Sequence, residues 1–271
     1  MTAWCGSRAK STCASNPVSR IFITGASSGI GAALAAHYAR EGAVLGLCAR
    51  RLAPTQALLA SLASEGACYQ VDVTDTASLQ AAAEDFTKRF GVPDVVIANA
   101  GIGAGTLTEY AEDLAAFRRI MDTNVLGMVV TFQPFVEPMR ARASGTLVGI
   151  ASVAGFRGLP GGGAYSASKA AAITYLESLR VELNGSGVSV VTICPGYVRT
   201  PLTAQNRYRM PFLIDADDAA RRIARVIAAQ RRFAVIPWRM GLVGVVLRAL
   251  PRWLFDRLFA RAPRKARGLP P

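Results

Sequence analysis

The sequence of 271 residues contains a single histidine, His37. Hydrolases with a G-x-S-x-G turn need a histidine base, which follows the serine and the acid along the chain. The run Gly25-Ala26-Ser27-Ser28-Gly29 fits that turn, but His37 lies only ten residues beyond Ser27, within one expected helix. An esterase built on this serine would lack its base, so this class of function is excluded.

Cysteine is also scarce, and its five copies are spread along the chain. They form no C-x-x-C pair and no histidine cluster accompanies them, so we expect no metal site. Their odd number and wide spacing indicate reduced, mostly buried thiols in a cytoplasmic protein. The five are Cys5, Cys13, Cys48, Cys68 and Cys194.

Long apolar runs are missing as well. About half of the residues are apolar (51%), yet no segment reaches the roughly 20 uninterrupted apolar residues that a membrane-spanning helix needs. Residues 1–17 also lack the apolar run of about 7 to 15 residues that marks a secretory signal. We therefore expect a flexible leader over residues 1–17, followed by a globular protein.

Acidic residues are few in the last quarter of the chain. Residues 199–271 hold 16 of the 31 basic side chains and 4 of the 18 acidic ones, so they account for nearly all of the net charge of +13. Between Trp238 and Phe259, apolar and aromatic residues alternate with arginines. Such a segment suits peripheral contact with a membrane, a neighbouring subunit or the mouth of a substrate pocket, and solubility alone also explains the charge. No recognition helix, zinc motif or RNA-binding motif accompanies it, so no nucleic-acid partner is expected.

Short, β-rich apolar runs alternate with segments of helical periodicity. This alternation predicts βαβ units and a parallel sheet in one α/β domain over residues 18–236. A helical C-terminal extension is expected over residues 237–271. The longest expected helix covers Asp113 to Arg142, with Pro134 and Pro138 bending or breaking its end. Strands are expected at residues 20–24, 44–48, 67–71, 93–98, 145–150, 188–194 and 233–236, and the other helices at residues 29–40, 56–64, 76–90, 164–184 and 217–230.

A glycine-rich turn, Gly25 to Gly31, lies between the first strand and the first helix. Its glycines permit a tight turn and close approach of the backbone, and the helix that follows offers unpaired N–H groups to a diphosphate. The spacing is G-x-x-x-G-x-G, which differs from the dinucleotide fingerprint G-x-G-x-x-G. The turn is therefore a candidate phosphate site by its position.

Two arginines, Arg50 and Arg51, follow the second strand. In dinucleotide-binding folds an acidic residue at this place binds the ribose 2′-hydroxyl, whereas an arginine accommodates a 2′-phosphate. The acid is absent here, which favours NADP(H) over NAD(H). Asp72 and Asn99 follow the third and fourth strands, whose carboxyl ends face the same crevice.

Tyr165 and Lys169 lie four residues apart and thus on one face of a helix. An ammonium close to a phenol favours the phenolate and lowers its pKa, so Tyr165 could act as an acid or base. Ser152 falls just past the end of the fifth strand, where its hydroxyl would point into the crevice. Asn124 lies inside the longest expected helix, where an asparagine is more often a tolerated surface residue than a functional group.

In this order along the chain, these motifs resemble the short-chain dehydrogenase/reductase family over roughly residues 18–236. The resemblance implies a doubly wound, Rossmann-like sheet of about seven parallel strands with helices on both faces. It also implies a homodimer or homotetramer, and hydride transfer between a nicotinamide and a carbonyl or secondary alcohol. The matching residues are Thr24 with the turn from Gly25 to Gly31, Asp72, Asn99-Ala100-Gly101, Asn124, Ser152, Tyr165 with Lys169, and Pro195-Gly196 with Thr200.

By this resemblance Tyr165 is the proton donor in reduction, Lys169 lowers its pKa and contacts the nicotinamide ribose, and Ser152 donates to the substrate oxygen. Asn124 would hold a water that relays protons to Lys169. One departure is Ala98, where the family often has the first of two asparagines. The implied cofactor contacts are Gly25, Ser27, Ser28, Gly29, Ile30, Gly31, Arg50, Arg51, Asp72, Val73, Asn99, Ala100, Gly101, Tyr165, Lys169, Pro195, Gly196, Val198 and Thr200.

Substrate choice in this fold rests on the segment after the sixth strand, about residues 201–215, together with the segments after Gly101 and Ser152. Leu202 and Phe212 are among the residues that make it apolar, while Arg207 and Arg209 add charge. A lipophilic ketone, 3-oxoacyl or steroid-like substrate suits this composition, with room for an acidic group. Packing of these apolar residues on the protein itself is an equal alternative. A catalytically silent cofactor-binding regulator is the alternative function, and the intact Ser152, Tyr165 and Lys169 favour the enzyme.

Overall fold

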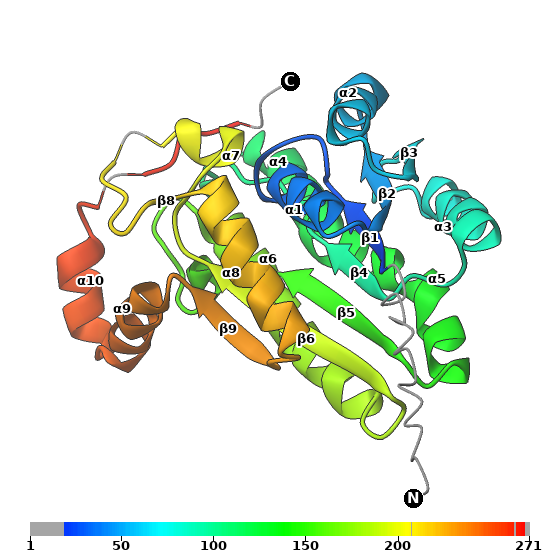
Figure 1. Cartoon of the computed structure of the whole chain (residues 1–271). Helices are drawn as coiled ribbons and strands as arrows, with labels where there is room; N and C mark the ends of the chain where they lie inside the picture. Colours follow the sequence, from blue (N-terminus) through cyan, green and yellow to red (C-terminus); the bar gives the residue numbers. More distant parts are fainter. Residues whose placement is uncertain (1–18, 207, 263, 269–271) are drawn as a thin grey trace, which may run out of the picture.

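The computed structural model describes residues 19–206, 208–262 and 264–268, so the expected leader lies outside the described residues (Figure 1). Seven parallel strands form the central sheet in the order β3-β2-β1-β4-β5-β6-β9, which confirms the expected sheet. The order reverses between β1 and β4, where the carboxyl ends of the strands border a crevice. The strands are β1 (Arg20–Thr24), β2 (Val44–Ala49), β3 (Gly66–Gln70), β4 (Val95–Ala98), β5 (Gly145–Ile150), β6 (Val188–Pro195) and β9 (Phe233–Ile236).

Helices cover both faces of this sheet (Figure 1). On one face, α1 (Gly29–Arg40), α2 (Leu52–Leu62) and α8 (Ala216–Ala228) pack through residues such as Leu34 and Ile223. On the other, α3 (Thr76–Phe90), α5 (Gly127–Ala141) and α6 (Gly163–Glu182) pack through residues such as Phe135 and Leu176. The central strands are buried on both sides, as expected of parallel strands between two helical layers.

Local sequence explains where several helices begin and how they pack. Asp75 caps α3 by accepting hydrogen bonds from the backbone N–H groups of Ala77 and Ser78 at 3.1 and 3.3 Å, which pairs two amides that have no partner within the helix. In α8 the alanines and isoleucines turn toward α1, while the arginines remain at the surface. The amphipathic pattern of α8 thus fixes which face meets the sheet.

The longest expected helix is interrupted. It consists of α4 (Asp113–Met121), a π turn at Asp122–Leu126 and α5, which continues to Ala141. Pro134 and Pro138 lie inside α5, so of the expected bend or break neither proline produces a break. The interruption falls instead at Asn124, and π turns of this kind often accompany functional sites.

The second helix begins earlier than expected. It starts at Leu52, so Pro54 lies in its first turn, where its missing N–H costs no hydrogen bond. A small two-stranded sheet, β7 (Val198–Arg199) with β8 (Ile214–Asp215), and the short helix α7 (Pro201–Ala204) were not anticipated. They hold the segment after β6 over the crevice.

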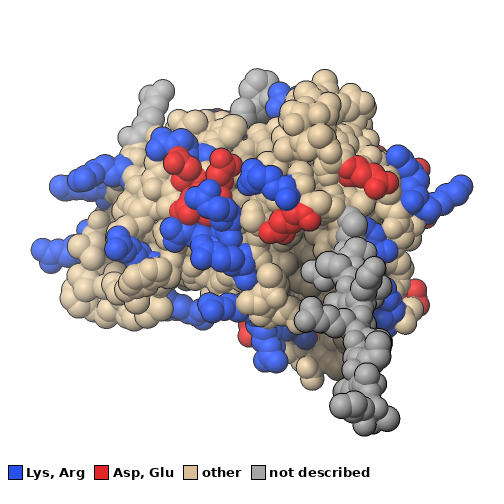
Figure 2. Space-filling model, viewed as in Figure 1, with Lys and Arg blue, Asp and Glu red and all other residues tan. Residues whose placement is uncertain are grey.

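The C-terminal extension is helical, as expected. It contains α9 (Trp238–Ala249) and α10 (Arg252–Phe259), after which the chain turns back toward α7 and α4 (Figure 1). Basic side chains gather around the end of the molecule that α9 and α10 form (Figure 2). Within the described ranges, every helix is too short or too polar to cross a bilayer.

Candidate active site

The turn between β1 and α1 is tightly enclosed. Gly25 has a φ of 69°, in the left-handed region that favours glycine. A Cβ on Gly25 would lie 2.7 Å from the Cα of Ala100, and one on Gly31 would collide with the carbonyl oxygen of Gly25. Ser28 starts α1 without a capping hydrogen bond from its side chain. The first amides of α1 therefore remain available to a diphosphate.

Asn99 braces this turn from the end of β4. Its side-chain nitrogen donates to the backbone oxygens of Thr24 and Gly25 at 3.1 and 3.0 Å. The backbone N–H of Ala100 donates to the Thr24 hydroxyl at 3.4 Å. Asn99 thus ties β4 to the turn through its side-chain amide. This structural role is separate from any contact between Asn99 and a cofactor.

Arg50 and Asp72 lie near each other where β2 and β3 end. Burial opposes ionisation of the Asp72 carboxyl, but hydrogen bonds from Thr74 and the charges of Arg50 and Arg119 outweigh it and lower the pKa of Asp72. Asp72 therefore stays ionised at neutral pH. Arg50 and the neighbouring Arg51 are both exposed, so a ligand phosphate could reach them.

Val73 follows Asp72 and is buried. A Cβ on Gly127, the first residue of α5, would lie 2.6 Å from a methyl group of Val73. The absence of a side chain at Gly127 lets Val73 pack closely on α5. Val73 is therefore turned into the core, whereas the preceding residue, Asp72, is half-buried at the crevice.

Ser152 and Tyr165 meet at the carboxyl end of β5. The Ser152 hydroxyl donates to the carbonyl of Pro195 at 3.4 Å and accepts from the backbone N–H of Ala154 at 3.1 Å. Burial raises the pKa of Tyr165, and a hydrogen bond with Ser152 acts in the opposite direction. Tyr165 is therefore protonated at neutral pH, as a proton donor must be.

Lys169 follows Tyr165 by about one turn of α6 and is only 4% exposed. Its ammonium donates to the carbonyl of Ile150 at 2.8 Å and lies 5.9 Å from the centre of the Tyr165 ring. Burial lowers the pKa of Lys169 to about 8, which the nearby Cys194 slightly opposes. The expected lowering of the Tyr165 pKa by Lys169 is not found, because the ammonium is directed at Ile150 and burial of the phenol dominates.

Asn124 is fully buried, so it is not one of the tolerated surface residues that most asparagines inside helices are. Its side-chain oxygen accepts from the N–H of Ile102 at 2.8 Å, and its nitrogen donates to Ile102 O and to the Ser168 hydroxyl, both at 2.9 Å. A Cβ on Gly101 would lie 3.2 Å from this oxygen and 3.5 Å from the Lys169 nitrogen. Asn124 therefore holds the loop after β4 beside Tyr165 and Lys169.

The segment after β6 closes the crevice on the side of the glycine turn. Gly196 N donates to Ile236 O at 2.8 Å, which ties the end of β6, Pro195, to β9. Val198 is buried, and the Thr200 methyl would lie 3.1 Å from a Cβ on Gly29. Thr200 thus reaches across the crevice to the glycine turn.

Two further tyrosines face the same space. The rings of Tyr197 and Tyr208 lie 6.3 Å apart at a steep angle. Burial raises the pKa of Tyr208 to about 12, and its closeness to Tyr197 and Tyr165 adds to this. Tyr208 therefore belongs to the wall of the site next to Tyr165. Of the two arginines expected in this segment, Arg209 is exposed and Arg207 lies outside the described residues.

Lys265 and Cys194 also lie at the site, although the sequence motifs did not predict them there. The Lys265 ammonium lies 5.5 Å from the centre of the Tyr165 ring, and a Cβ on Gly103 would be 3.2 Å from it. Cys194 is buried beside Lys169 and Ser152, and burial raises the pKa of its thiol to about 12. The place of Cys194 at the carboxyl end of β6 could have indicated that it lies near the crevice. For Lys265 the only signal was the basic composition of the tail.

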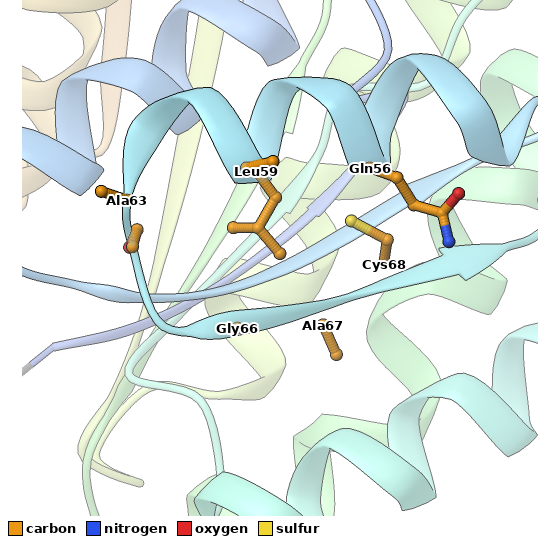
Figure 3. A pocket seen from close by; sticks show the side chains of 8 residues that line it. Gln56, Leu59, Ala63, Gly66, Ala67 and Cys68 are labelled. Carbon is orange, nitrogen blue, oxygen red and sulfur yellow. The ribbon is translucent and has the colours of Figure 1, made fainter.

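The hollow between α2 and β3 lies elsewhere. Gln56, Leu59 and Cys68 line it at an edge of the sheet (Figure 3). It contains none of the side chains that meet at the ends of β1, β4, β5 and β6. We therefore assign the chemistry to the crevice and not to this hollow. Among residues 19–206, 208–262 and 264–268, the metal-ligating side chains form no group of three or more.

The crevice thus combines a phosphate-binding turn with a buried phenol, a hydroxyl and an ammonium. When bound with its diphosphate on the glycine turn, a nicotinamide dinucleotide would supply or accept a hydride. The three polar groups can then bind the substrate oxygen and exchange a proton with it. These groups together can interconvert a carbonyl and an alcohol.

Comparison with known proteins agrees with this chemistry. Residues 19–210 match the family model described as short chain dehydrogenase. An oxidoreductase of Myxococcus xanthus is 40% identical over 237 residues, which cover 86% of this chain and 93% of that protein.

Two solved structures are similar to most of this chain. A short-chain dehydrogenase from Sphingobium yanoikuyae in complex with NADPH has 26% identity and a TM-score of 0.73, with 87% of this chain and 97% of that one covered. A 3-ketoacyl-(acyl-carrier-protein) reductase from Brucella melitensis complexed with NADH has 26% identity and a TM-score of 0.73, covering 80% and 94%. The chain belongs to the short-chain dehydrogenase family, whose members are oxidoreductases that use NAD(P) to interconvert CH–OH and C=O groups.

Proposed function

We propose that this enzyme is an NADP(H)-dependent oxidoreductase that transfers a hydride between the nicotinamide and a lipophilic carbonyl or secondary alcohol. The observation that carries the proposal is the meeting of Tyr165, Ser152 and Lys169 next to the glycine turn. The hydride acceptor is the carbonyl carbon in reduction, and its oxygen becomes an alkoxide that takes one proton. In oxidation the same steps run in reverse.

Tyr165 donates the proton in reduction, since burial keeps its phenol protonated. Ser152 orients the substrate oxygen by a hydrogen bond that strengthens as charge develops there. Lys169, with a pKa near 8, can return a proton to Tyr165 and bind the hydroxyls of the nicotinamide ribose. Asn124 sets the position of Gly101 and Lys169, and a water held by its remaining acceptor capacity would link Lys169 to solvent.

The cofactor preference rests on Arg50 and Arg51, which lie exposed after β2 where the 2′-phosphate would sit. Asp72 and Val73 are assigned to the adenine, the turn from Gly25 to Gly31 to the diphosphate, and Val198 with Thr200 to the carboxamide. The similar structures include an NADPH complex and an NADH complex, so the arginines carry this part of the proposal.

An NADPH oxidation screen tests the proposal. Carbonyls from small ketones to acyl thioesters and steroids are offered with NADPH and with NADH. We expect turnover with at least one lipophilic carbonyl and higher kcat/KM with NADPH, and Arg50→Asp should reverse the preference while Arg40→Asp, on α1, should not. Equal kcat/KM for both cofactors in the wild-type protein contradicts the role of Arg50. Tight NADPH binding without turnover of any carbonyl would favour the silent regulator.

Self-association is part of the proposal. Several large apolar side chains on α4, α6 and the π turn are exposed, namely Leu114, Phe117, Leu126 and Val181. Exposed apolar side chains of this size are typical of surfaces that a second copy of the chain covers in a dimer or tetramer. Light scattering after size-exclusion chromatography should give a multiple of 28.6 kDa, and Val181→Glu should reduce it.

A second proposal concerns the surface of α9 and α10. Trp238, Val245 and Trp253 are each more than 60% exposed. The same two helices carry Arg239, Arg248, Arg252 and Arg257, and basic side chains gather at this end of the molecule (Figure 2). Interfacial helices combine such apolar residues with arginines that attract anionic lipids. We therefore propose peripheral contact with an anionic membrane from a cytoplasmic location, which the free thiols of Cys48 and Cys194 would also suit.

Vesicle sedimentation tests this second proposal. The wild-type protein should pellet with vesicles that contain phosphatidylglycerol, and Trp238→Ser with Trp253→Ser should remain in the supernatant. Trp238→Phe with Trp253→Phe keeps aromatic side chains at both positions and is the matched control, which should pellet like the wild type. Equal recovery of wild type and the serine double variant in the pellet would contradict membrane contact through these helices.

A further inference from the structure

The chain after α10 crosses back over the candidate active site. The backbone N–H of Gly105 donates to Ala266 O at 2.7 Å, and Gly105 pairs with Arg267 as an isolated parallel bridge. A Cβ on Gly105 would collide with the carbonyl oxygen of Lys265. The segment 264–268, which we call the C-terminal strap, therefore lies directly on the loop after β4.

Side chains fasten the strap on both sides of Lys265. The Arg267 guanidinium donates to Asp113 Oδ2 at 2.9 Å and to Glu112 Oε1 at 2.8 Å, and it stacks 3.5 Å from the centre of the Tyr110 ring. Asp113 is buried and also accepts from the backbone N–H of Leu107 at 2.8 Å. These charge-assisted hydrogen bonds fix the path of the strap over the loop.

On the other side of Lys265, Arg264 lies against the loop after β5. A Cβ on Gly161 would be 2.8 Å from the Cβ of Arg264. Gly161 in turn accepts a hydrogen bond from Thr106 N at 3.0 Å. The strap thus joins the two loops that border the substrate side of the crevice.

This path carries the Lys265 ammonium to within 5.5 Å of the centre of the Tyr165 ring. The side chain is half-buried, and burial lowers its pKa. Among the described residues no carboxylate forms an ion pair with it, and the nearby Asp113 and Glu112 pair with Arg267 of the strap. Keeping an ammonium in such a place costs free energy unless a ligand supplies the opposite charge.

We propose that Lys265 is a specificity residue that binds an anionic group of the substrate, a carboxylate or phosphate a few bonds from the carbonyl that Tyr165 protonates. The proposal rests on the proposed reductase function and adds the chemical class of its substrate. Lys169 already places an ammonium 5.9 Å from the centre of the Tyr165 ring, so proton transfer does not require a second one. Lys265 instead discriminates between charged and neutral carbonyl compounds.

Matched substrate pairs test the proposal. The 2-, 3- and 4-oxopentanoates are compared with their methyl esters, and the ratio of kcat/KM for acid and ester is measured with NADPH. For at least one pair the wild-type ratio should exceed one, and Lys265→Met should lower it at least tenfold while Lys265→Arg preserves it. Arg261→Met, which removes an exposed charge at the end of α10, should leave the ratio unchanged.

A binding measurement separates failure of this proposal from failure of the proposed function. Protection of the NADPH complex against thermal unfolding should be greater for the oxo acid than for its ester, and Lys265→Met should abolish the difference even if no pair is turned over. Equal protection by acid and ester, or none by any oxo acid, overturns the proposal. Faster turnover of every substrate by Lys265→Met would also overturn it, because the lysine would then only obstruct the site. A variant in which only the KM for NADPH rises would overturn it as well.

Discussion

Replacing Lys169 by methionine should abolish turnover and yet stabilise the fold at neutral pH. Burial lowers the pKa of Lys169 from 10.5 to about 8. One pKa unit corresponds to about 1.4 kcal/mol, so holding this ammonium in the folded protein at pH 7 costs about 3 kcal/mol. Methionine is of similar length and removes this cost, but it leaves the Ile150 carbonyl without its donor, a loss of about 1 to 3 kcal/mol.

The sign of the pH dependence follows from the lowered pKa. Between about pH 8 and 10.5 the unfolded chain binds more protons than the folded one at Lys169, so the stability of the wild-type protein rises with pH in this window. The advantage of Lys169→Met, about 1 kcal/mol at pH 7, should therefore shrink and reverse as the pH approaches 10.5. Other titrating groups are shared by both proteins and cancel in the difference.

Urea unfolding followed by far-UV circular dichroism at several values of pH measures this difference. Lys88→Met is the matched control, because Lys88 is exposed on α3, and its difference from the wild type should not change between pH 7 and 10. A Lys169→Met protein that is less stable than the wild type by the same amount throughout this range would refute the reasoning.

Two further variants probe the hydroxyl and the amide of the site. Ser152→Ala should lower kcat by about 10²- to 10³-fold with little change in NADPH affinity, since one donor to the developing oxyanion is lost; steady-state kinetics measure this, and an unchanged kcat would contradict it. Asn124→Ala should lower the free energy of unfolding by about 2 kcal/mol or more, because it leaves both backbone groups of Ile102 without their partners. Urea unfolding would contradict this with a loss below about 0.5 kcal/mol.

Much of the fold could be predicted because strand runs and helix periodicity are local. The strands at residues 20–24, 145–150 and 233–236 and the helices at residues 29–40 and 76–90 are found at the expected positions. The carboxyl ends of parallel strands share one edge of the sheet, so Asp72, Asn99, Ser152 and Pro195 were expected near one another. Local pattern and sheet geometry together therefore located the site.

The remaining features depend on contacts between distant segments. The π turn at Asn124 has no local sequence signal, because it arises where the Asn124 amide pairs with Ile102, which lies 22 residues away. The spacing of Tyr165 and Lys169 put both on one face of α6, but the carbonyl of Ile150 sets the direction of the ammonium. The strap joins Arg267 to Asp113, which are separated by 154 residues. No local pattern reports such pairs.

The most direct test of the central assignment is the turnover of Tyr165→Phe. The variant lacks only the phenolic oxygen, so it should bind NADPH with nearly the wild-type Kd, measured by the change in cofactor fluorescence. Its kcat for the best carbonyl of the screen should fall below detection. A Tyr165→Phe protein with nearly wild-type kcat would contradict the assignment of Tyr165 as the proton donor.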